Sequence, residues 1–406
     1  MDIAGIVCEF DPFHNGHAYL LNKVRKQGAS GIVCVMSGDF VQRGGPALCD
    51  KFLRAEAAVR CGADLVLELP AVYAVNSADY FARGAVRILK GLGCIDTIAF
   101  GSESADEEML CRIAAATAAE STEFSEAVKT GLSEGKSYPE AYQEALKTVH
   151  EGLDASVLSS PNDILALSYL REIIRQNAGF MPFAVKRSGA GHGEKSQCGP
   201  IASASYIRGQ IASGNDAWQD KVPEEAKTAQ ALQKLTSGEL ALRKERLFAV
   251  VRQTAFAASG EELAGIAEIS EGLENRLLSA VNSASSPDGI IGRITTSRYT
   301  ASRASRILMQ LILGITKDIV AYAEDDQTAY AKVLAFNEKG AEILRLAKEN
   351  GTIPVYSNIN KIQDKNAQND PVLALDLRAA DIYSVLCGRP ASEYSDRVQI
   401  PKMLQI

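Results

Sequence analysis

The stretch GIVCEFDPFHNGHAYLL, from Gly5 to Leu21, decides the fold expected of this chain. It begins with an apolar, β-branched run typical of a buried strand and continues into an amphipathic pattern typical of a helix. The turn between them contains Gly16 and two of the four histidines of the protein, His14 and His17. Two scarce residues three positions apart, where a strand passes into a helix, indicate a ligand site.

The same alternation of strand and helix patterns continues through the first hundred residues. The strand-like runs span residues 2–10, 31–38, 64–70 and 97–104. They are apolar on both faces, as in buried parallel sheets, and amphipathic segments separate them. The sequence therefore predicts an α/β fold with a doubly wound, Rossmann-like parallel sheet. Such sheets bind ligands beyond the carboxyl ends of their strands, where the loop with His14 and His17 lies.

The length of the chain predicts a second domain. With 406 residues, it exceeds the roughly 250 to 300 residues at which single cores stop growing. Beyond about Gly209 the strand signals fade, and residues 224–255 and 329–350 show the pattern of amphipathic helices. We expect an α/β domain over residues 1–210 and a mostly α-helical C-terminal domain over residues 211–406.

Composition excludes several classes of protein. Charged residues make up 23% and apolar residues 46%, which is ordinary for a soluble globular chain. The net charge of -7 means that nucleic acid can bind only to a local basic patch. The eight cysteines are scattered without zinc-ligand spacing, and no signal peptide or membrane span is evident. We expect a cytoplasmic protein.

Three interpretations of the histidine pair remain open at this point. Each histidine could be a surface or packing residue, or the pair could bind zinc, although no third His or Cys lies nearby in sequence. The third interpretation is phosphate chemistry, because a helix N-terminus attracts anions and Gly16 lets a phosphate approach the backbone. Two imidazoles there can donate hydrogen bonds to phosphoryl oxygens whose charge grows in the transition state.

Two motifs give the chain a resemblance to a known superfamily. FDPFHNGH matches the HxGH signature of nucleotidyltransferases, and IASASYIRGQI, from Ile201 to Ile211, resembles their ISxTxIR signature. Ser203, Ser205 and Arg208 occupy its key positions, with Ser205 where many members have threonine. More narrowly, six segments together resemble the tRNA(Met) cytidine acetate ligase family. They are GIVCEFDPFHNGH, MSGDFVQRGGPA, GADLVLELP, FGSES, SPNDIL and SRYTASRASRIL.

The resemblance implies an activity, a co-substrate and partners. Such an enzyme activates acetate with ATP, forming acetyl-adenylate and releasing pyrophosphate. It then transfers the acetyl group to the exocyclic amine of the wobble cytidine in elongator tRNA(Met). Magnesium is expected together with ATP, and the sequence does not assign its ligands.

The resemblance also implies the residues of the site. His14 and His17 are expected to be catalytic, acting on the phosphates of ATP within a loop that wraps the nucleotide. The residues of this loop are Val7, Cys8, Glu9, Phe10, Asp11, Pro12, Phe13, His14, Asn15, Gly16, His17, Ala18, Tyr19 and Leu20. The further ATP-binding residues are Gly101, Asn162, Arg187, Ser203 and Arg208, although Gly101 could be only a turn glycine and Asn162 only a helix cap. The segment Gly38 to Lys51 is expected to form a mobile loop over the site.

One basic segment stands out in the second half. No acid lies between Ile290 and Leu308, and the resemblance makes this segment a candidate for tRNA binding. The expected tRNA-binding residues are Arg298, Tyr299, Arg303 and Arg306. A solvated helix face that packs its apolar side on the core remains the alternative.

Two other functions compete with the ligase. A small-molecule nucleotidyltransferase of cofactor synthesis shares HxGH and needs no RNA. A non-catalytic nucleotide-binding or RNA-binding module would carry a vestigial site. The long helical half argues against the former, and the intact motifs argue against the latter.

Overall fold

The computed structural model describes residues 2–118, 122–136, 138–149, 160–187, 199–270, 272–296, 299–325 and 328–405. Its centre is an eight-stranded sheet in the order β10-β8-β5-β2-β1-β6-β7, with β9 paired to β8. The strands are β1 (Ile3–Cys8), β2 (Gly31–Ser37), β5 (Leu65–Leu69), β6 (Thr97–Ser102), β7 (Met181–Lys186), β8 (Ala331–Phe336), β9 (Val355–Tyr356) and β10 (Lys402–Met403).

The five strands β5-β2-β1-β6-β7 are parallel and form the predicted doubly wound core. Their order changes direction at β1, so the topological switch point lies between β1 and β6, where such folds bind ligands. Alternate residues of β2 join two different apolar clusters, with Val33 and Val35 on one face and Ile32, Cys34 and Met36 on the other. Burial on both faces explains why these strands are apolar throughout.

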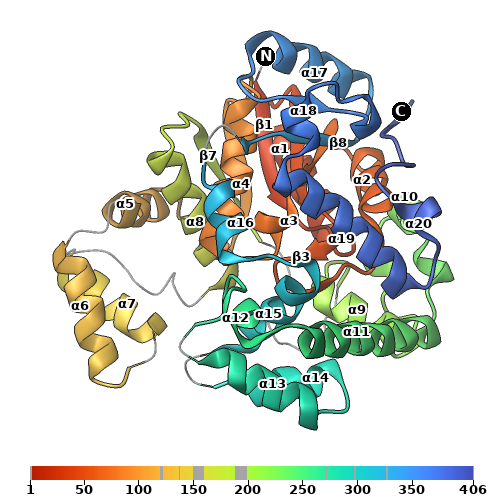
Figure 1. Cartoon of the computed structure of the whole chain (residues 1–406). Coiled ribbons are helices and arrows are strands. Elements are labelled where there is room, and N and C mark those ends of the chain that lie inside the picture. The colour runs from red at the N-terminus through yellow and green to blue at the C-terminus, as the bar shows by residue number, and fades with distance from the viewer. Residues whose placement is uncertain are drawn as a thin grey trace.

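Helices cover both faces of the sheet (Figure 1). Leu21 of α1 and Val59 of α2 join the cluster on one face, and Leu89 of α4, Leu170 of α8 and Ile343 of α17 join the cluster on the other. The helices of the N-terminal half are α1 (Asn15–Lys26), α2 (Lys51–Arg60), α3 (Ala71–Ala74), α4 (Ala78–Gly91), α5 (Glu107–Ala118), α6 (Thr122–Ser133), α7 (Tyr138–Val149), α8 (Pro161–Arg175) and α9 (Ala204–Ala212).

The C-terminal half is mostly helical, as predicted. Its helices are α10 (Glu224–Ala229), α11 (Ser237–Ala257), α12 (Gly260–Ala264), α13 (Leu273–Ser283), α14 (Pro287–Ile294), α15 (Ala301–Leu313), α16 (Lys317–Ala323), α17 (Glu338–Asn350), α18 (Lys365–Gln368), α19 (Pro371–Cys387) and α20 (Ala391–Tyr394). In the described part of the chain, no helix combines the length and apolarity needed to cross a membrane.

The C-terminal half also contributes to the sheet, which the sequence did not predict. Residues 329–350 were expected to be helical, but Ala331–Phe336 forms strand β8 and only Glu338–Asn350 forms helix α17. β8 pairs antiparallel with β5. The AKVLAF run consists largely of good helix formers, and its pairing with a strand more than 260 positions earlier overrides that preference. The sheet therefore extends past the domain boundary expected at residue 210.

The segment expected to be a mobile loop is a packed hairpin. β3 (Phe40–Val41) and β4 (Gly45–Pro46) pair antiparallel, and Phe40 and Val41 are buried. The backbone of Gly44 approaches α15 so closely that a Cβ there would lie 2.3 Å from the nitrogen of Arg306. Burial of β3 anchors the hairpin and leaves its tip, Gln42 and Arg43, beside the switch point.

Candidate active site

A cavity of about 440 Å³ opens at the switch point between β1 and β6. Three helices begin at its wall: α1, α8 and α9. Each N-terminus carries a partial positive charge. At α8 the backbone N–H groups of Asn162 and Asp163 already donate to Glu103, so it is the N-termini of α1 and α9 that favour an anionic ligand. The Asn15 side chain connects the start of α1 to the segment before α9, because it donates to the carbonyl of Pro200 at 2.7 Å. It also donates to the carbonyl of Asp220 at 2.9 Å.

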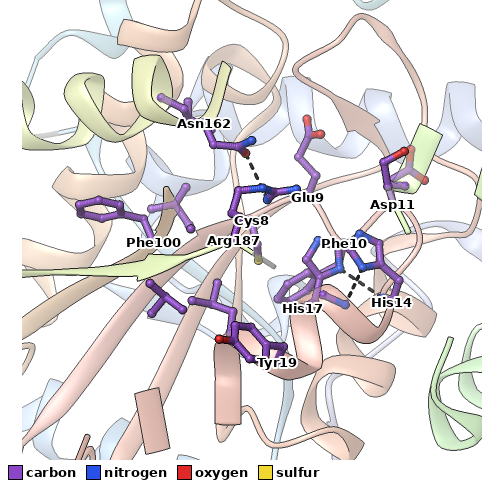
Figure 2. A pocket seen from close by; sticks show the side chains of 18 of the residues that line it. Cys8, Glu9, Phe10, Asp11, His14, His17, Tyr19, Phe100, Asn162 and Arg187 are labelled. Carbon is purple, nitrogen blue, oxygen red and sulfur yellow. Dashed lines mark hydrogen bonds between the residues drawn. The ribbon is translucent and has the colours of Figure 1, made fainter. Parts of the chain in front are cut away.

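The two histidines form the start of α1 (Figure 2). His14 is the N-cap, and its Nδ1 accepts the backbone N–H of Gly16 at 3.0 Å. His17 Nδ1 accepts the backbone N–H of His14 at 3.2 Å, which completes a capping box built from imidazoles. The rings stack with centroids 3.7 Å apart and planes at 22°.

This capping arrangement fixes the tautomer of both rings. A neutral imidazole has one acceptor nitrogen and one donor nitrogen. Since Nδ1 of each ring accepts a backbone N–H, each Nε2 carries the proton and is a hydrogen-bond donor. The site therefore offers two parallel donors from adjacent rings.

Electrostatics keep the two imidazoles neutral in the free protein. Burial, together with the positive charges of Arg187 and Arg208, lowers the pKa of His14 to about 3. Burial, followed by His14 and Arg187, lowers the pKa of His17 well below its usual value. At neutral pH neither ring carries a charge, so an anionic ligand meets two N–H donors rather than two imidazolium ions.

Gly16 is required by the position of the first ring. A Cβ on this residue would lie 2.9 Å from Cε1 of His14 and 3.1 Å from its Nδ1. Such contacts are closer than a methyl group tolerates, and the ring cannot move without losing its bond to the Gly16 N–H. The glycine of HxGH is thus a steric condition for the histidine cap.

Two phenylalanine rings pack against the ring of His17. Phe10 and Phe13 are buried, and their ring centroids lie 4.8 and 5.5 Å from that of His17. Phe10 adopts a φ of 48°, a left-handed conformation that is strained for a bulky residue. The packing of its ring holds it there, and Phe13 N–H is tied to Gln230 Oε1 at 2.8 Å.

Arg54 links the ends of β1 and β2, and sequence patterns did not reveal it. Its side chain is fully buried, and it donates to the carbonyls of Cys49 (2.9 Å), Glu9 (2.6 Å), Ser37 (3.2 Å) and Gly38. A buried cation that binds the carbonyls at two strand ends fixes the loop that carries the histidines. Nothing in its helical context, KFLRAEAAVR, distinguishes it from a surface arginine.

The opposite wall is built around Glu103. This carboxylate accepts the backbone N–H groups of Asn162 and Asp163, each at 3.1 Å, and the side-chain amide of Asn162. Arg187 Nη1 donates to Asn162 Oδ1 at 3.4 Å. Glu103 thereby orients Asn162 directly and Arg187 through Asn162. Its place directly after a strand end, in FGSES, is the signal that could have identified it.

The segment that resembles the ISxTxIR signature, residues 201–211, also lies at the cavity. Ser203 caps α9, where its hydroxyl accepts the N–H of Tyr206 at 3.2 Å. Arg208 donates to the backbone carbonyl of Asp11, and its Nη1 lies 3.4 Å from Asp11 Oδ2. These contacts bring the second motif against the first across nearly two hundred residues of sequence.

Most residues predicted to bind the nucleotide line this one cavity. They are Val7, Cys8, Glu9, Phe10, Asp11, His14, Gly16, His17, Tyr19, Leu20, Gly101, Asn162, Arg187, Ser203 and Arg208. Four predicted residues do not line it, namely Pro12, Phe13, Asn15 and Ala18. Lining residues that were not predicted to bind the nucleotide include Gln42 and Arg43 of the hairpin tip, Phe100, Glu103 and Tyr169.

The basic segment of the helical half is largely engaged within the protein. Arg298 lies outside the described residues. Tyr299 and Arg306 are buried, which differs from the exposed patch that was expected. Arg306 Nε pairs with Glu268 Oε1 at 2.8 Å, and Arg303 stacks on the Tyr299 ring at 4.8 Å. Glu268, distant in sequence, thus neutralises Arg306 in a segment that looked uniformly basic.

The fold and the histidine site define a class of protein, and comparison with known proteins agrees with it. The family described as HIGH Nucleotidyl Transferase matches residues 1–397, so the chain is a member of that family. Within this class it belongs to the tRNA(Met) cytidine acetate ligase family. It is 38% identical to the ligase of Acetivibrio thermocellus, with 96% of each chain covered, and 37% identical to that of Syntrophomonas wolfei, with 98% covered.

Solved structures agree with this assignment. Thermotoga maritima TmcAL bound with alpha-thio ATP matches with a TM-score of 0.87 at 29% identity. The apo form of the same protein matches with a TM-score of 0.90 at 30% identity. Both comparisons cover the whole of each chain. They confirm the predicted α/β nucleotidyltransferase fold with its helical C-terminal part.

Proposed function

We propose that this protein is an ATP-dependent ligase that activates acetate as acetyl-adenylate. It then transfers the acetyl group to the exocyclic amine of the wobble cytidine of elongator tRNA(Met), giving N4-acetylcytidine. The observation that carries this proposal is the pair of imidazole Nε2 donors at a cavity where three helices begin. The names of its relatives and the ATP analogue in the T. maritima structure support it.

In this proposal the triphosphate of ATP lies at the N-termini of α1 and α9. His14 and His17 donate through Nε2 to its oxygens, and Ser203 and Arg208 bind it from the other side. The nucleoside extends toward Gly101, Asn162 and Arg187. A Cβ at Gly101 would meet Arg187 Cγ at 3.4 Å, so the absence of a side chain leaves the strand end accessible. From Asn15 we expect only a backbone contact, because its side chain is engaged elsewhere.

The chemistry proceeds in two transfers. A carboxylate oxygen of acetate attacks the α-phosphorus, a new O–P bond forms, and the bond to the bridging oxygen breaks, releasing pyrophosphate. Charge accumulates on the phosphoryl oxygens during this step, where the histidine donors and Arg208 stabilise it. The amine of cytidine then attacks the acetyl carbonyl, and AMP leaves.

Magnesium is expected to enter together with ATP. Among the described residues, no group of three or more His, Cys, Asp or Glu is arranged to hold a metal ion. Mg²⁺ commonly takes its ligands from substrate phosphates, water and one or two carboxylates, so a dedicated protein cage is unnecessary.

Purified protein supplied with ATP, labelled acetate and bulk tRNA is expected to acetylate cytidine in one tRNA species. The measurement is the label in digested nucleosides of separated tRNAs, with release of one pyrophosphate per acetyl group. Omission of ATP should abolish both signals. Label in a nucleotide-linked small product, with none in RNA, would instead assign the protein to small-molecule nucleotidyl transfer.

Contact between tRNA and the segment around α15 stays a proposal. For Arg303→Ala, we expect the slope of log Kd against log salt to fall by about one unit, as for one lost phosphate contact. For Arg306→Ala, we expect an unchanged slope and a free energy of unfolding lower by about 2 kcal/mol, because Glu268 loses its charged partner. Filter binding across a salt series and chemical denaturation measure the two effects. An unchanged slope for Arg303→Ala would assign this residue to folding alone.

A further inference from the structure

Glu9 belongs to the loop predicted to wrap ATP, but the proposed function gives its carboxylate no role. It follows β1 directly, and Figure 2 shows it between the Arg187 side chain and Asp11. Its Oε1 accepts the backbone N–H of Gln42, at the hairpin tip, at 2.7 Å. No hydrogen bond among the described residues involves its second oxygen, Oε2. One oxygen therefore orients the group while the other remains open to the cavity.

The other acid groups of the cavity wall are already engaged. Asp11 accepts the backbone N–H of Leu48 at 2.6 Å through Oδ1, and its Oδ2 faces Arg208 at 3.4 Å. Glu103 holds the start of α8, with both of its oxygens accepting from Asn162 or Asp163. Neither carboxylate can take up a proton without losing contacts that shape the site.

The histidines are not available as bases either. Nδ1 of each ring is already an acceptor for a backbone N–H. The remaining nitrogen, Nε2, already carries a proton and can only donate. A histidine pair arranged in this way stabilises negative charge, and it cannot remove a proton from an attacking group.

The acetyl-transfer step requires a group that removes a proton. The lone pair of the exocyclic amine of cytidine is delocalised into the base, so the amine is a weak nucleophile. It must lose one proton as its bond to the acetyl carbon forms. A carboxylate is also the side chain that accepts a hydrogen bond from this amino group, whereas the O4 carbonyl of uridine would repel it.

We propose that Glu9 is the general base of the acetyl-transfer step and contacts the amine of the target cytidine through Oε2. This inference rests on the proposed function. Glu9 accepts one proton from the amine as the N–C bond forms, and the C–O bond to the adenylate phosphate breaks. AMP leaves with the electron pair of that bond, and the proton passes from Glu9 to solvent.

The electrostatic surroundings suit this role. Burial, then the negative charge of Asp11, raises the pKa of Glu9, while the Gln42 N–H and the charges of Arg43 and Arg208 oppose the rise. The titratable and charged groups around it include Cys8, Asp11, Arg43, Arg54, Tyr169, Arg187 and Arg208. A base is most effective when its pKa approaches the operating pH.

The test separates the two half-reactions in the full-length enzyme. Glu9→Gln keeps an oxygen for the Gln42 N–H and removes the proton acceptor. We expect acetyl-adenylate and pyrophosphate to form from ATP and labelled acetate within about threefold of the wild-type rate. When tRNA(Met) is added to preformed acetyl-adenylate, we expect single-turnover transfer to fall by about 10²–10⁴-fold. Glu342→Gln, on the exposed face of α17, is the matched control and should leave both rates unchanged.

A pH series gives a second, independent result. The wild-type transfer rate should rise with pH through the titration of Glu9 and then level off, and Glu9→Gln should lose this rise. Transfer at the wild-type rate in the variant would overturn the proposal. Equal loss of both half-reactions would assign Glu9 a role in the activation of acetate by ATP, and this result would overturn the proposal as well. Absence of acetyl-adenylate in the wild-type protein would contradict the proposed function itself, which is a separate outcome.

Discussion

His17→Ala is expected to lower the rate of acetyl-adenylate formation by about 10²–10³-fold while the protein stays folded. The substitution removes one of the two Nε2 donors that stabilise the phosphoryl oxygens as their charge increases. Because this interaction strengthens in the transition state, the loss should appear in kcat more than in KM for ATP. Single-turnover formation of labelled acetyl-adenylate measures the rate, and equilibrium binding of an ATP analogue measures ground-state affinity.

The neighbouring residue provides the matched control. Asn15→Ala changes the same motif, but its side chain holds the carbonyls of Pro200 and Asp220 outside the cavity. For this variant we expect a free energy of unfolding lower by about 1 kcal/mol and a rate of activation within a few-fold of wild type. A normal activation rate in His17→Ala would remove the histidine pair from the mechanism.

Lys51→Met is expected to lower the free energy of unfolding by about 3–5 kcal/mol. Lys51 belongs to a buried charge cluster that consists of Asp39, Lys51, Glu68, Lys332 and Asp396, all at most 4% exposed. Its Nζ lies 2.9 Å from Glu68, 2.7 Å from Asp396 and 3.5 Å from Asp39. The substitution removes the lysine partner of Asp39 and leaves Glu68 and Asp396 to share Lys332. Urea denaturation at pH 7 measures the loss.

The effect should depend on pH in a defined direction. Although burial raises it, the charges of Lys332 and Lys51 hold the pKa of Asp396 below its usual value. A carboxylate with a lowered folded-state pKa contributes stability above its unfolded pKa of about 3.9 and loses it as the pH falls. The difference in the free energy of unfolding between wild type and Lys51→Met should therefore shrink below about pH 4.

Lys402→Met, which removes an exposed pair with Glu56, is the control and should change stability by less than about 0.5 kcal/mol. A Lys51→Met variant as stable as this control would contradict the assigned role of the cluster.

The residues that sequence reasoning placed correctly belong to short, repeated patterns. The runs that became β1, β2, β5 and β6 were recognisable because strands buried on both faces must be apolar throughout. His14, Gly16 and His17 were recognisable because two scarce imidazoles and a glycine fall together at the start of one helix. In both cases the relevant interactions lie within a few positions along the chain.

The errors arose where a distant segment decides the outcome. Residues 331–336 were expected to be helical, but they form a strand because they pair with β5. The segment around residues 40–46 was expected to be mobile, but it is a packed hairpin that lies against α15. Arg306 looked like a free phosphate ligand because Glu268, which neutralises it, lies almost forty positions earlier. Arg54 gave no signal, because its four carbonyl partners come together only in the folded chain.

The sequence alone determined the class of fold, the position of the site at a strand end, and the two histidines with their glycine, because periodicity, capping and steric fit are local properties. The tertiary structure decided how these groups behave chemically. Burial and distant arginines lowered the pKa of both imidazoles, distant contacts gave Asp11 and Glu103 structural roles, and one oxygen of Glu9 stayed open to the cavity. Whether a polar atom is engaged or available depends on partners from the whole chain, and only folding brings those partners together.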